Sequence, residues 1–417
     1  MKKKTWSVLL STLLAAVIAL NFTGCEMTAQ AESLMESITP GRVTGKVSDE
    51  AFLVSQADFA VKLFQQTSAG DGSTLVSPLS MMLALSMTAN GAQGQTKTEM
   101  ETVLGGDIPL EDLNEYLYQY IQVLSGGEDS GLHIANSIWF RDEEDRLTVE
   151  KDFLQKNADY YKADAFKTPF NDNTLKEINQ WTSDNTDGMV DEILQEIDSE
   201  SMLYLINTLA FHAEWSTPYT KINLAKGAFT TISGEEKTVD MMTSTEGRYL
   251  DDGQATGFLK SYKNGYSFAA LLPNEGVDIH DYIASLTGET LYSIIQNERA
   301  ETVICKLPKF QYDCSIEMND ALTAMGMPTA FDGENADFSA MATSVDGNIC
   351  IGDVLHKTFI SVGEKGTEAG AATVVEMDAR SAAPSEIYEV TLDRPFVYMI
   401  VDDTYGLPVF IGTVMDI

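Results

Sequence analysis

The fold of this chain is decided by the stretch EKGTEAGAATVVEMDARSAAPSE, which covers residues 364–386. Its small side chains cannot anchor a core, and its glycines and β-branched residues make it a poor helix. If it forms a strand, alternate residues from Thr367 to Val375 share one face, and all of them are small or apolar. Because an unpaired charge is costly to bury, this face indicates a strand that is ready to enter the middle of an existing sheet.

The chain is strongly acidic. Its 417 residues include 27 Lys and Arg and 63 Asp and Glu, which gives a formal net charge of −36. This charge repels phosphate and argues against a nucleic-acid partner, while it favours solubility and partners with basic surfaces. With 44% hydrophobic residues, the chain is long enough for one large domain or two smaller ones.

Residues 1–24 are predicted to be a signal peptide of the lipoprotein type. Three lysines precede an apolar run over residues 8–20, which is short for a membrane span. The run ends in Phe22-Thr23-Gly24-Cys25, and small residues before a single Cys resemble a lipobox. We therefore expect a lipid on Cys25, a flexible tether over residues 25–50 and a folded domain over residues 51–417. An ordinary signal peptide cut nearby is the alternative.

The three cysteines beyond Cys25 are Cys305, Cys314 and Cys350. Cys305 and Cys314 flank a strand-like run and could form a disulfide, but buried free thiols are the favoured interpretation. No Cys or His spacing typical of a metal site occurs, so no metal or cofactor is expected.

Apolar patterns predict helices mainly in the first half of the chain and strands mainly later. Helices are expected over residues 51–66, 78–90, 99–104, 110–124, 175–182 and 316–324. Strands are expected over residues 134–140, 202–213, 267–272, 302–307, 358–362 and 409–414. Because no internal repeat and no interior linker occur, this mixture predicts a single α+β domain.

The motifs of common catalytic sites are missing from the sequence. Four histidines occur, but no GxSxG, HExxH, GxxxxGK[ST] or GxGxxG accompanies them. Acidic pairs such as Asp251-Asp252 are most simply solvated turns. The sequence therefore does not predict an enzyme.

Eight motifs in order along the chain resemble the serpin family. They are LVSPLSMMLALSMTANGAQGQTKTEM (75–100), ANSIWF (135–140), INQWTSDNTDGMVDEIL (178–194), LINTLAFHAEW (205–215), LPKFQYDCSIEMNDALTAMGM (307–327), ADFSAM (336–341), VLHKTFISVGEKGTEAG (354–370) and DRPFVYMIVDDTYGLPVFIGTV (393–414). The similarity spans roughly residues 51–417.

The resemblance implies a serpin fold of three β-sheets and eight to nine helices, with a mobile reactive-centre loop at about residues 364–392. It also implies a suicide mechanism, in which a protease attacks the loop and forms an acyl-enzyme. The freed loop then inserts into the central sheet as a new strand and distorts the protease before deacylation. The folded inhibitor is therefore expected to be metastable.

Site residues follow from the matching motifs. The hinge of the loop comprises Glu364, Gly366, Thr367, Glu368, Ala369, Gly370, Ala371, Ala372 and Thr373. The sheet-opening cluster comprises Ser77, Ser80, Asn207 and His356, together with Trp215 beneath the point where the loop enters the sheet. A buried polar cluster of this kind can hold strands together and still exchange partners.

The resemblance implies a reactive bond between Arg380 and Ser381, because in many inhibitory serpins this bond lies sixteen residues beyond the hinge glutamate, which is Glu364 here. An arginine there fits the buried Asp of a trypsin-like specificity pocket. Cleavage after Val375 or Ala379 would suit an elastase-like protease. Cleavage after Met377 would suit a chymotrypsin- or elastase-like protease, and these bonds stay open as alternatives.

The sequence thus predicts an irreversible inhibitor of serine endopeptidases, trypsin-like ones first and elastase-like ones second. We expect a secreted monomer that is held at the surface of a bacterial cell only through the lipid on Cys25. The alternative is a non-inhibitory serpin that acts as a binding or carrier protein.

Overall fold

The structure is a computed structural model of the 417-residue chain. It describes residues 31–125, 131–141, 146–186, 188, 190, 192–197, 201–345, 347–367 and 386–417. Within these ranges the chain forms nine α-helices, and none of them is both long and apolar enough to span a bilayer. The helices are α2 (Glu50–Thr67), α3 (Pro78–Ala89), α4 (Gly94–Gly105), α5 (Leu110–Leu124), α6 (Lys151–Tyr161), α7 (Asp172–Asn185), α8 (Ile279–Ser285), α9 (Gly288–Gln296) and α10 (Asn319–Met325).

Local sequence explains where the first helices begin. The Asp49 side chain caps α2 by accepting a hydrogen bond from the Phe52 amide at 3.0 Å. The Ser77 side chain caps α3 by accepting one from the Ser80 amide at 3.2 Å, and Pro78 stands in the first turn. Because every residue of α3 is buried, this helix lies in the centre of the core.

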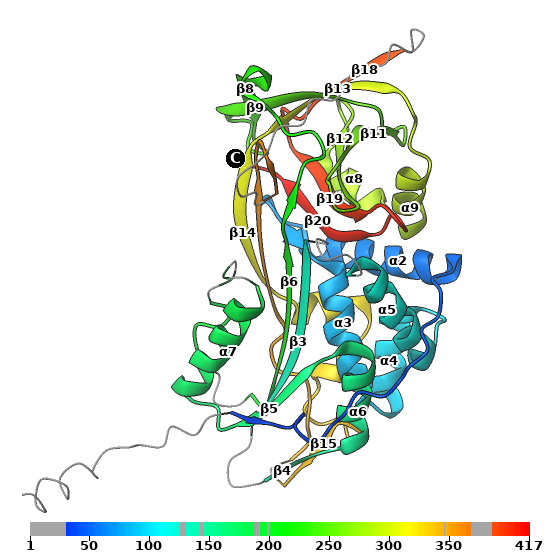
Figure 1. The fold of residues 1–417 in the computed structure, drawn as a ribbon, viewed down its shortest axis with the longest axis vertical. Helices are drawn as coiled ribbons and strands as arrows, with labels where there is room; N and C mark the ends of the chain where they lie inside the picture. Colours follow the sequence, from blue (N-terminus) through cyan, green and yellow to red (C-terminus); the bar gives the residue numbers. More distant parts are fainter. Residues whose placement is uncertain are drawn as a thin grey trace, which may run out of the picture.

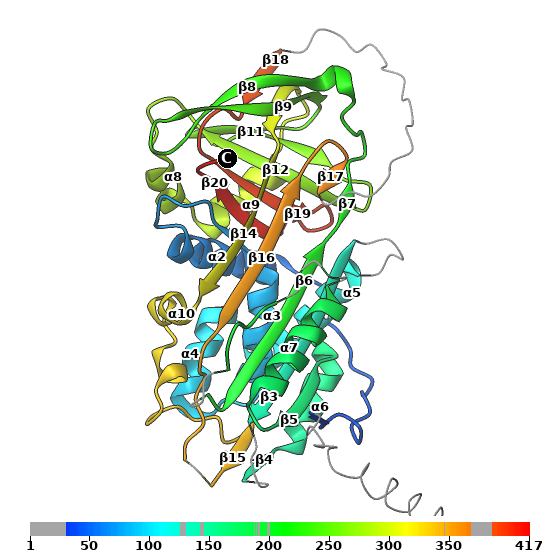
Figure 2. The ribbon, with the colours of Figure 1, turned by 90° about the vertical axis from the view of Figure 1, so that its left-hand side faces the viewer.

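Five strands lie side by side along the length of the molecule (Figure 2). They are β5 (Asp164–Thr168), β3 (Leu132–Arg141), β6 (Leu203–Phe211), β16 (Leu355–Val362) and β14 (Phe310–Glu317). β3 pairs in parallel with β5 and antiparallel with β6, and β14 pairs antiparallel with β16. Among the described residues no ladder joins β6 to β16, so the central sheet has a seam between these two strands.

The seam is bridged at its upper end by two short strands. β7 (Ala213–Glu214) continues the line of β6, and β17 (Gly366–Thr367) lies between β7 and β16. The outer face of β3, β5 and β6 is covered by α7 (Figure 2), which packs on a small core that includes Trp139, Ile178 and Tyr204. Helices α3 and α5 lie on the other side of the sheet (Figure 1).

Two further sheets lie above helices α2, α3 and α5 (Figure 1). One has the order β10 (Tyr249–Asp251), β11 (Ala255–Ser261), β12 (Tyr266–Pro273), β19 (Phe396–Asp402), β20 (Pro408–Val414) and β2 (Leu75–Val76). The other has the order β18 (Ile387–Thr391), β13 (Thr302–Pro308), β9 (Glu236–Glu246) and β8 (Leu224–Thr230). Smaller elements are the pair β4 (Leu147–Val149) and β15 (Ala342–Ser344), and the 3₁₀ helices at Lys221–Asn223 and Pro328–Phe331.

The α+β class is confirmed, and the predicted elements are found with one partial exception. Residues 316–324 were predicted as one helix, but Ile316 and Glu317 complete β14 and α10 begins at Asn319. From Phe310 to Glu317, less exposed and fully exposed residues alternate with the period of a strand. Ile316 and Glu317 follow this pattern and therefore belong to the strand rather than to the predicted helix. Cys305, Cys314 and Cys350 are free thiols, as predicted, but of the three Cys305 is buried whereas Cys314 and Cys350 are partly exposed.

Residues 31–49 differ from the predicted flexible tether, because they lie against the body of the protein. β1 (Glu32–Ser33) pairs antiparallel with β5, and the Leu34 amide donates to the Ala165 carbonyl at 2.8 Å. The side chains of Leu34, Met35 and Ile38 pack against the main core.

Polar contacts continue along the same segment. The Gly41 amide donates to an Asp159 carboxylate oxygen at 2.6 Å, and the Lys46 ammonium lies 2.6 Å from the Asp112 carboxylate. The apolar residues of this segment show no period in the sequence, yet the backbone of β1 covers the edge strand β5, which would otherwise expose unpaired backbone groups. The prediction of a tether is therefore wrong for residues 31–49, and residues 25–30 lie outside the described part.

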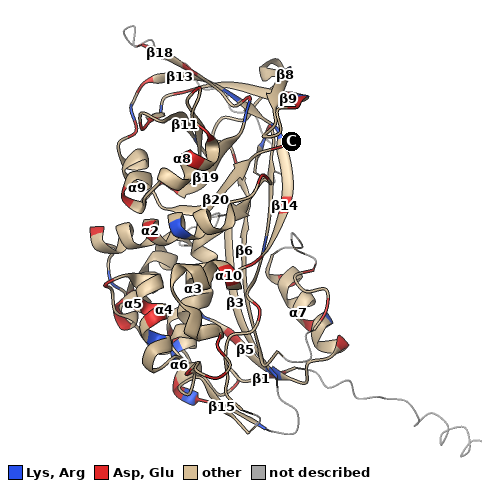
Figure 3. Ribbon diagram, turned by 180° about the vertical axis from the view of Figure 1, so that it is seen from behind, with Lys and Arg blue, Asp and Glu red and all other residues tan. Residues whose placement is uncertain are grey.

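The negative charge is spread over the molecule. Figure 3 shows Asp and Glu residues on α5, α7 and α9, which lie at different places on the ribbon. This distribution agrees with the interpretation of the charge as general solubility.

Candidate functional site

The hinge of the loop begins as an inserted strand. In β17, Thr367 pairs with Val362 of β16 and with Ala213 of β7, and Gly366 pairs with Glu214. The first residues of the loop therefore already occupy the upper end of the seam in the central sheet (Figure 2).

Thr367 reaches a buried polar partner. Its hydroxyl oxygen lies 2.6 Å from the hydroxyl oxygen of Tyr262, and both residues are 3% exposed. The Tyr262 ring stacks on the Trp215 ring with a centroid distance of 4.3 Å. An uncharged, hydroxyl-bearing residue thus fits this place, whereas a charge would be buried without a counter-charge.

Gly366 is required by close packing of the backbone. Its φ is +155°, and a Cβ built on it would lie 2.0 Å from the Ala213 carbonyl oxygen. Any side chain would therefore push β17 away from β7. This explains a glycine at the start of the inserted strand.

A turn over residues 215–219 holds the base of the loop. The Trp215 amide donates to the Lys365 carbonyl at 2.8 Å, and the Trp215 indole donates to the Gly363 carbonyl at 2.9 Å. The Tyr219 amide donates to the Glu364 carbonyl at 2.8 Å. Trp215, which is fully buried, therefore lies against the chain that enters the sheet.

Glu364 is fixed by a partner that sequence reasoning missed. The Lys309 ammonium donates a hydrogen bond to the Glu364 carboxylate and forms an ion pair with it. This hydrogen bond holds the pKa of the Glu364 carboxyl below its usual range, although partial burial acts in the opposite direction. Lys309 follows β13, and nothing in its local sequence indicates that it meets the hinge.

The structure brings four predicted residues together at the start of α3. The Ser77 amide donates to Nε2 of His356 at 2.9 Å, and the Ser77 hydroxyl donates to the Val409 carbonyl at 2.8 Å. The Ser80 hydroxyl donates to the Asn207 side-chain oxygen. Since His356 lies on β16 and Asn207 on β6, this polar cluster joins the two strands on either side of the seam.

Burial controls the protonation of His356. Its side chain is buried, and desolvation lowers the pKa of the imidazole to about 4. The neutral ring can then accept a hydrogen bond from the Ser77 amide on Nε2.

The cluster continues through residues that sequence reasoning missed. The Asn207 amide donates to Asn136 Oδ1, and the Asn136 amide donates to the Tyr161 carbonyl at 3.3 Å. The Tyr161 hydroxyl donates to Asn114, which exchanges hydrogen bonds with Asn90. The available signal in the sequence was the presence of Asn90, Asn114 and Asn136 within apolar stretches, because amides that become buried there need partners.

The remaining predicted site residues lie outside the described residues. These are the lipidation site Cys25, the hinge residues Glu368, Ala369, Gly370, Ala371, Ala372 and Thr373, and the reactive bond Arg380-Ser381, with the alternatives Val375, Met377 and Ala379. Their assignments remain predictions.

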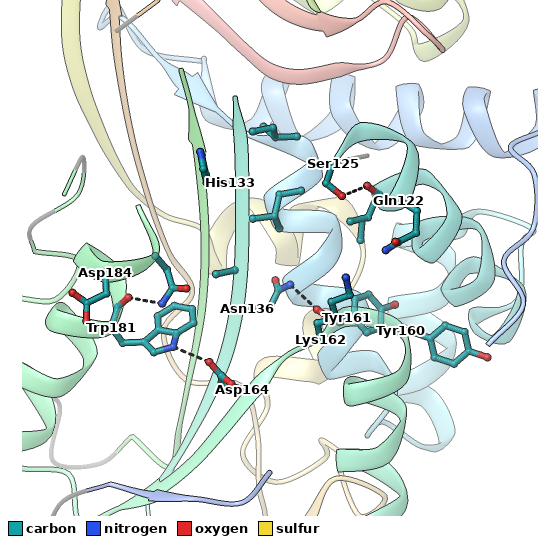
Figure 4. A pocket seen from close by; sticks show the side chains of 15 residues that line it. Gln122, Ser125, His133, Asn136, Tyr160, Tyr161, Lys162, Asp164, Trp181 and Asp184 are labelled. Carbon is teal, nitrogen blue, oxygen red and sulfur yellow. Dashed lines mark hydrogen bonds between the residues drawn. The ribbon is translucent and has the colours of Figure 1, made fainter. Parts of the chain in front are cut away.

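A pocket of about 480 Å³ lies beside the polar cluster (Figure 4). It lies between β3, α5, α6 and α7, and its wall includes His133, Tyr160 and Trp181. The Trp181 indole donates to the Asp164 carboxylate at 3.0 Å. In the described part of the chain no group of three or more His, Cys, Asp or Glu residues could hold a metal ion.

The geometry thus shows a central sheet with an open seam, a loop that starts in the seam and a polar cluster behind it. The family model described as Serpin (serine protease inhibitor) matches residues 54–417. The chain belongs to the serpin family. Serpins generally act as protease inhibitors rather than enzymes, and they generally target proteases.

Individual relatives agree with this assignment. Serpin-Z2B of Triticum aestivum is 29% identical over 387 residues, which cover 87% of this chain and 96% of that protein. The thermophilic serpin tengpin in its native state is 46% identical, with a TM-score of 0.89 over 93% of this chain and 100% of that chain. Human thyroxine-binding globulin, solved with its ligand, is 26% identical, with a TM-score of 0.77 over 88% of this chain and 99% of that chain.

Proposed function

We propose that this serpin is an irreversible suicide-type inhibitor of serine endopeptidases. A protease cleaves the loop, and the freed loop inserts between β6 and β16 before the acyl-enzyme is hydrolysed. The observation that carries the proposal is β17, because its pairing with both β16 and β7 is the start of the inserted strand.

The register of β17 also indicates where the inserted residues would lie. Each further residue of the loop would move one residue back along β6 and one back along β16. If this register continued through the inserted loop, Thr373 would lie beside both Asn207 and His356, the two residues that the polar cluster joins across the seam. A threonine hydroxyl can donate and accept, so it could take over hydrogen bonds when the cluster separates.

The proposed target class follows from the loop sequence. Arg380 as the residue before the reactive bond would fit a trypsin-like pocket, whereas cleavage after Val375, Met377 or Ala379 would favour elastase- or chymotrypsin-like enzymes. The acidic surface would add attraction for basic proteases at low ionic strength. We further propose that the protein acts as a secreted monomer, anchored at a bacterial cell surface through a lipid on Cys25.

The test is incubation of residues 26–417 with trypsin and, separately, with an elastase, followed by denaturing electrophoresis and mass spectrometry. A band at the summed mass that survives denaturation would support the covalent trap. A released C-terminal peptide that begins at Ser381 would support the Arg380-Ser381 bond. If both enzymes cleave the loop and stay active, the proposal fails for these two target classes.

A carrier protein is the second candidate function. It is favoured by the similarity to thyroxine-binding globulin and by the pocket beside α5 and α7. The two functions differ in what loop cleavage does. Cleavage of an inhibitory serpin should raise the melting temperature by tens of degrees as the strand inserts, whereas cleavage of a carrier that cannot insert should barely change it.

A further inference from the structure

Lys260 on β11 is a buried cation beside the hinge. Its side chain is 2% exposed, and its ammonium lies 2.8 Å from the Glu246 carboxylate, which is 17% exposed. The same ammonium donates to the Thr217 carbonyl at 3.2 Å. A charge buried this deeply is rare and needs partners of this kind.

Two aromatic rings complete the surroundings of Lys260. Its ammonium lies 4.5 Å from the ring centroid of Tyr219 and 5.4 Å from that of Trp215. Both distances are in the range of a cation–π interaction. Thr217, Tyr219 and Trp215 all belong to the turn that holds the base of the loop, so Lys260 contacts this turn at three residues.

The turn provides the first hydrogen bonds of the inserted strand. The bond from the Trp215 amide to the Lys365 carbonyl directly precedes the pairing of Gly366 with Glu214. Any strand that grows from β17 must extend this register. A turn held rigidly would offer the freed loop a fixed starting point, and fixed geometry reduces the entropy that alignment costs.

We propose that Lys260 and Glu246 are positioning residues for loop insertion, because they fix the turn over residues 215–219 on which the inserted strand starts. The inference rests on the proposed inhibitory function and deepens it. The pair does not touch the protease. It affects the outcome because it favours loop insertion over hydrolysis of the acyl-enzyme.

The first test is hydrogen exchange in the intact, uncleaved protein. Lys260→Met conserves side-chain volume and removes the charge. We expect exchange of the amides of residues 213–220 to rise about tenfold, since local opening becomes easier. Lys306→Met is the matched control. Lys306 lies on β13, which pairs with the strand β9 that carries Glu246, and its ammonium lies 3.0 Å from the exposed Glu389 carboxylate. Equal exchange in the parent and Lys260→Met would overturn the inference.

The second test separates positioning from cleavage. Lys260→Met should raise the number of inhibitor molecules consumed per trapped protease several-fold, while the rate constant for the first attack on the loop stays unchanged. A change in the attack rate alone, with the same partition, would contradict the proposal.

A double variant tests whether the effect of Lys260→Met comes only from the unpaired, buried carboxylate of Glu246. Glu246→Leu with Lys260→Met removes both charges and so leaves no unpaired buried ion. We expect Lys260→Met alone to lower the melting temperature of the cleaved protein, because it leaves Glu246 unpaired. The double variant should restore this melting temperature but not the slow exchange of residues 213–220. Recovery of slow exchange would mean that Lys260 serves charge balance alone. If the parent traps neither protease, the proposed function fails, yet the exchange experiment still decides the role of the pair.

Discussion

The Ser77 amide donates a hydrogen bond of 2.9 Å to Nε2 of His356, and among the described residues this is the only hydrogen bond of that ring. The bond requires an unprotonated Nε2, and burial lowers the pKa of His356 to about 4. The unfolded chain would protonate the same ring near 6.5. The polar cluster that links β6 to β16 is therefore complete only while His356 is neutral.

Acid should weaken the polar cluster and lower the free energy of unfolding. The contribution of His356 is fully present above pH 6.5 and is lost as the pH falls from 6.5 to about 4, because the unfolded state binds the proton first. We expect a loss of about 2 kcal/mol between pH 7 and pH 5, measured from chemical denaturation. Asp402, whose pKa burial raises to about 6, acts with the opposite sign. Because Asp402 is present in both proteins, a comparison with His356→Gln isolates the contribution of His356. If the free energy of unfolding depends equally on pH in the two proteins, the role assigned to His356 is contradicted.

The face of the loop that enters the sheet should not tolerate charge. Ala371→Arg would bury a guanidinium between β6 and β16, so we expect the inhibitor consumed per trapped protease to rise by about tenfold or more. Cleavage should occur at the same bond. Ala372→Arg lies on the opposite face of the strand and serves as the matched control, which should inhibit like the parent. Full inhibition by Ala371→Arg would refute loop insertion in this register.

The residue before the reactive bond should set the target. Arg380→Ala removes the charge that a trypsin-like pocket recognises, and we expect trypsin inhibition to fall by about two orders of magnitude. Elastase inhibition should persist or increase. Unchanged trypsin kinetics, or a released peptide that does not begin at Ser381, would place the bond elsewhere.

The ion pair of Glu364 with Lys309 should stabilise the hinge in the uncleaved protein. Glu364→Lys places two ammonium groups together beside β17, whereas the parent has an ion pair with Lys309. We expect the inhibitory monomer to have a shorter lifetime on warming. This lifetime is measured by size-exclusion chromatography and by residual inhibitory activity. Glu389→Lys makes the same change at the exposed pair with Lys306. Because exposed ion pairs contribute little, this control should behave like the parent, and equal lifetimes of both variants would argue against a special role for Glu364.

The segment over residues 31–49 should stabilise the fold. Leu34→Asp disrupts apolar packing next to the β1–β5 pairing, and we expect the melting temperature to fall by a few degrees. Val47→Asp is the control in the same segment, since Val47 is 77% exposed. A melting temperature unaffected by Leu34→Asp would mean that the docked segment adds no stability.

Much of the site was predictable because it depends on local pattern. The alternation from Thr367 onward predicted a strand with an uncharged face, and the structure shows that Thr367 is buried beside Tyr262. Ser77 and Pro78 are a helix start that can be read from the sequence, and α3 begins there. His356 and Asn207 came from the resemblance rather than from periodicity, because a single buried polar residue has no pattern of its own.

Contacts between distant segments could not be predicted from local pattern. The sequence by itself determined the order of helices and strands, the small and uncharged inner face of the hinge and the acidic charge, since these follow from neighbouring residues. Tertiary structure alone decided that Lys309 pairs with Glu364, that Lys260 is buried with Glu246 and that residues 31–49 cover the edge of β5. Each of these depends on which strands become neighbours, and burial then gives a common side chain its electrostatic role.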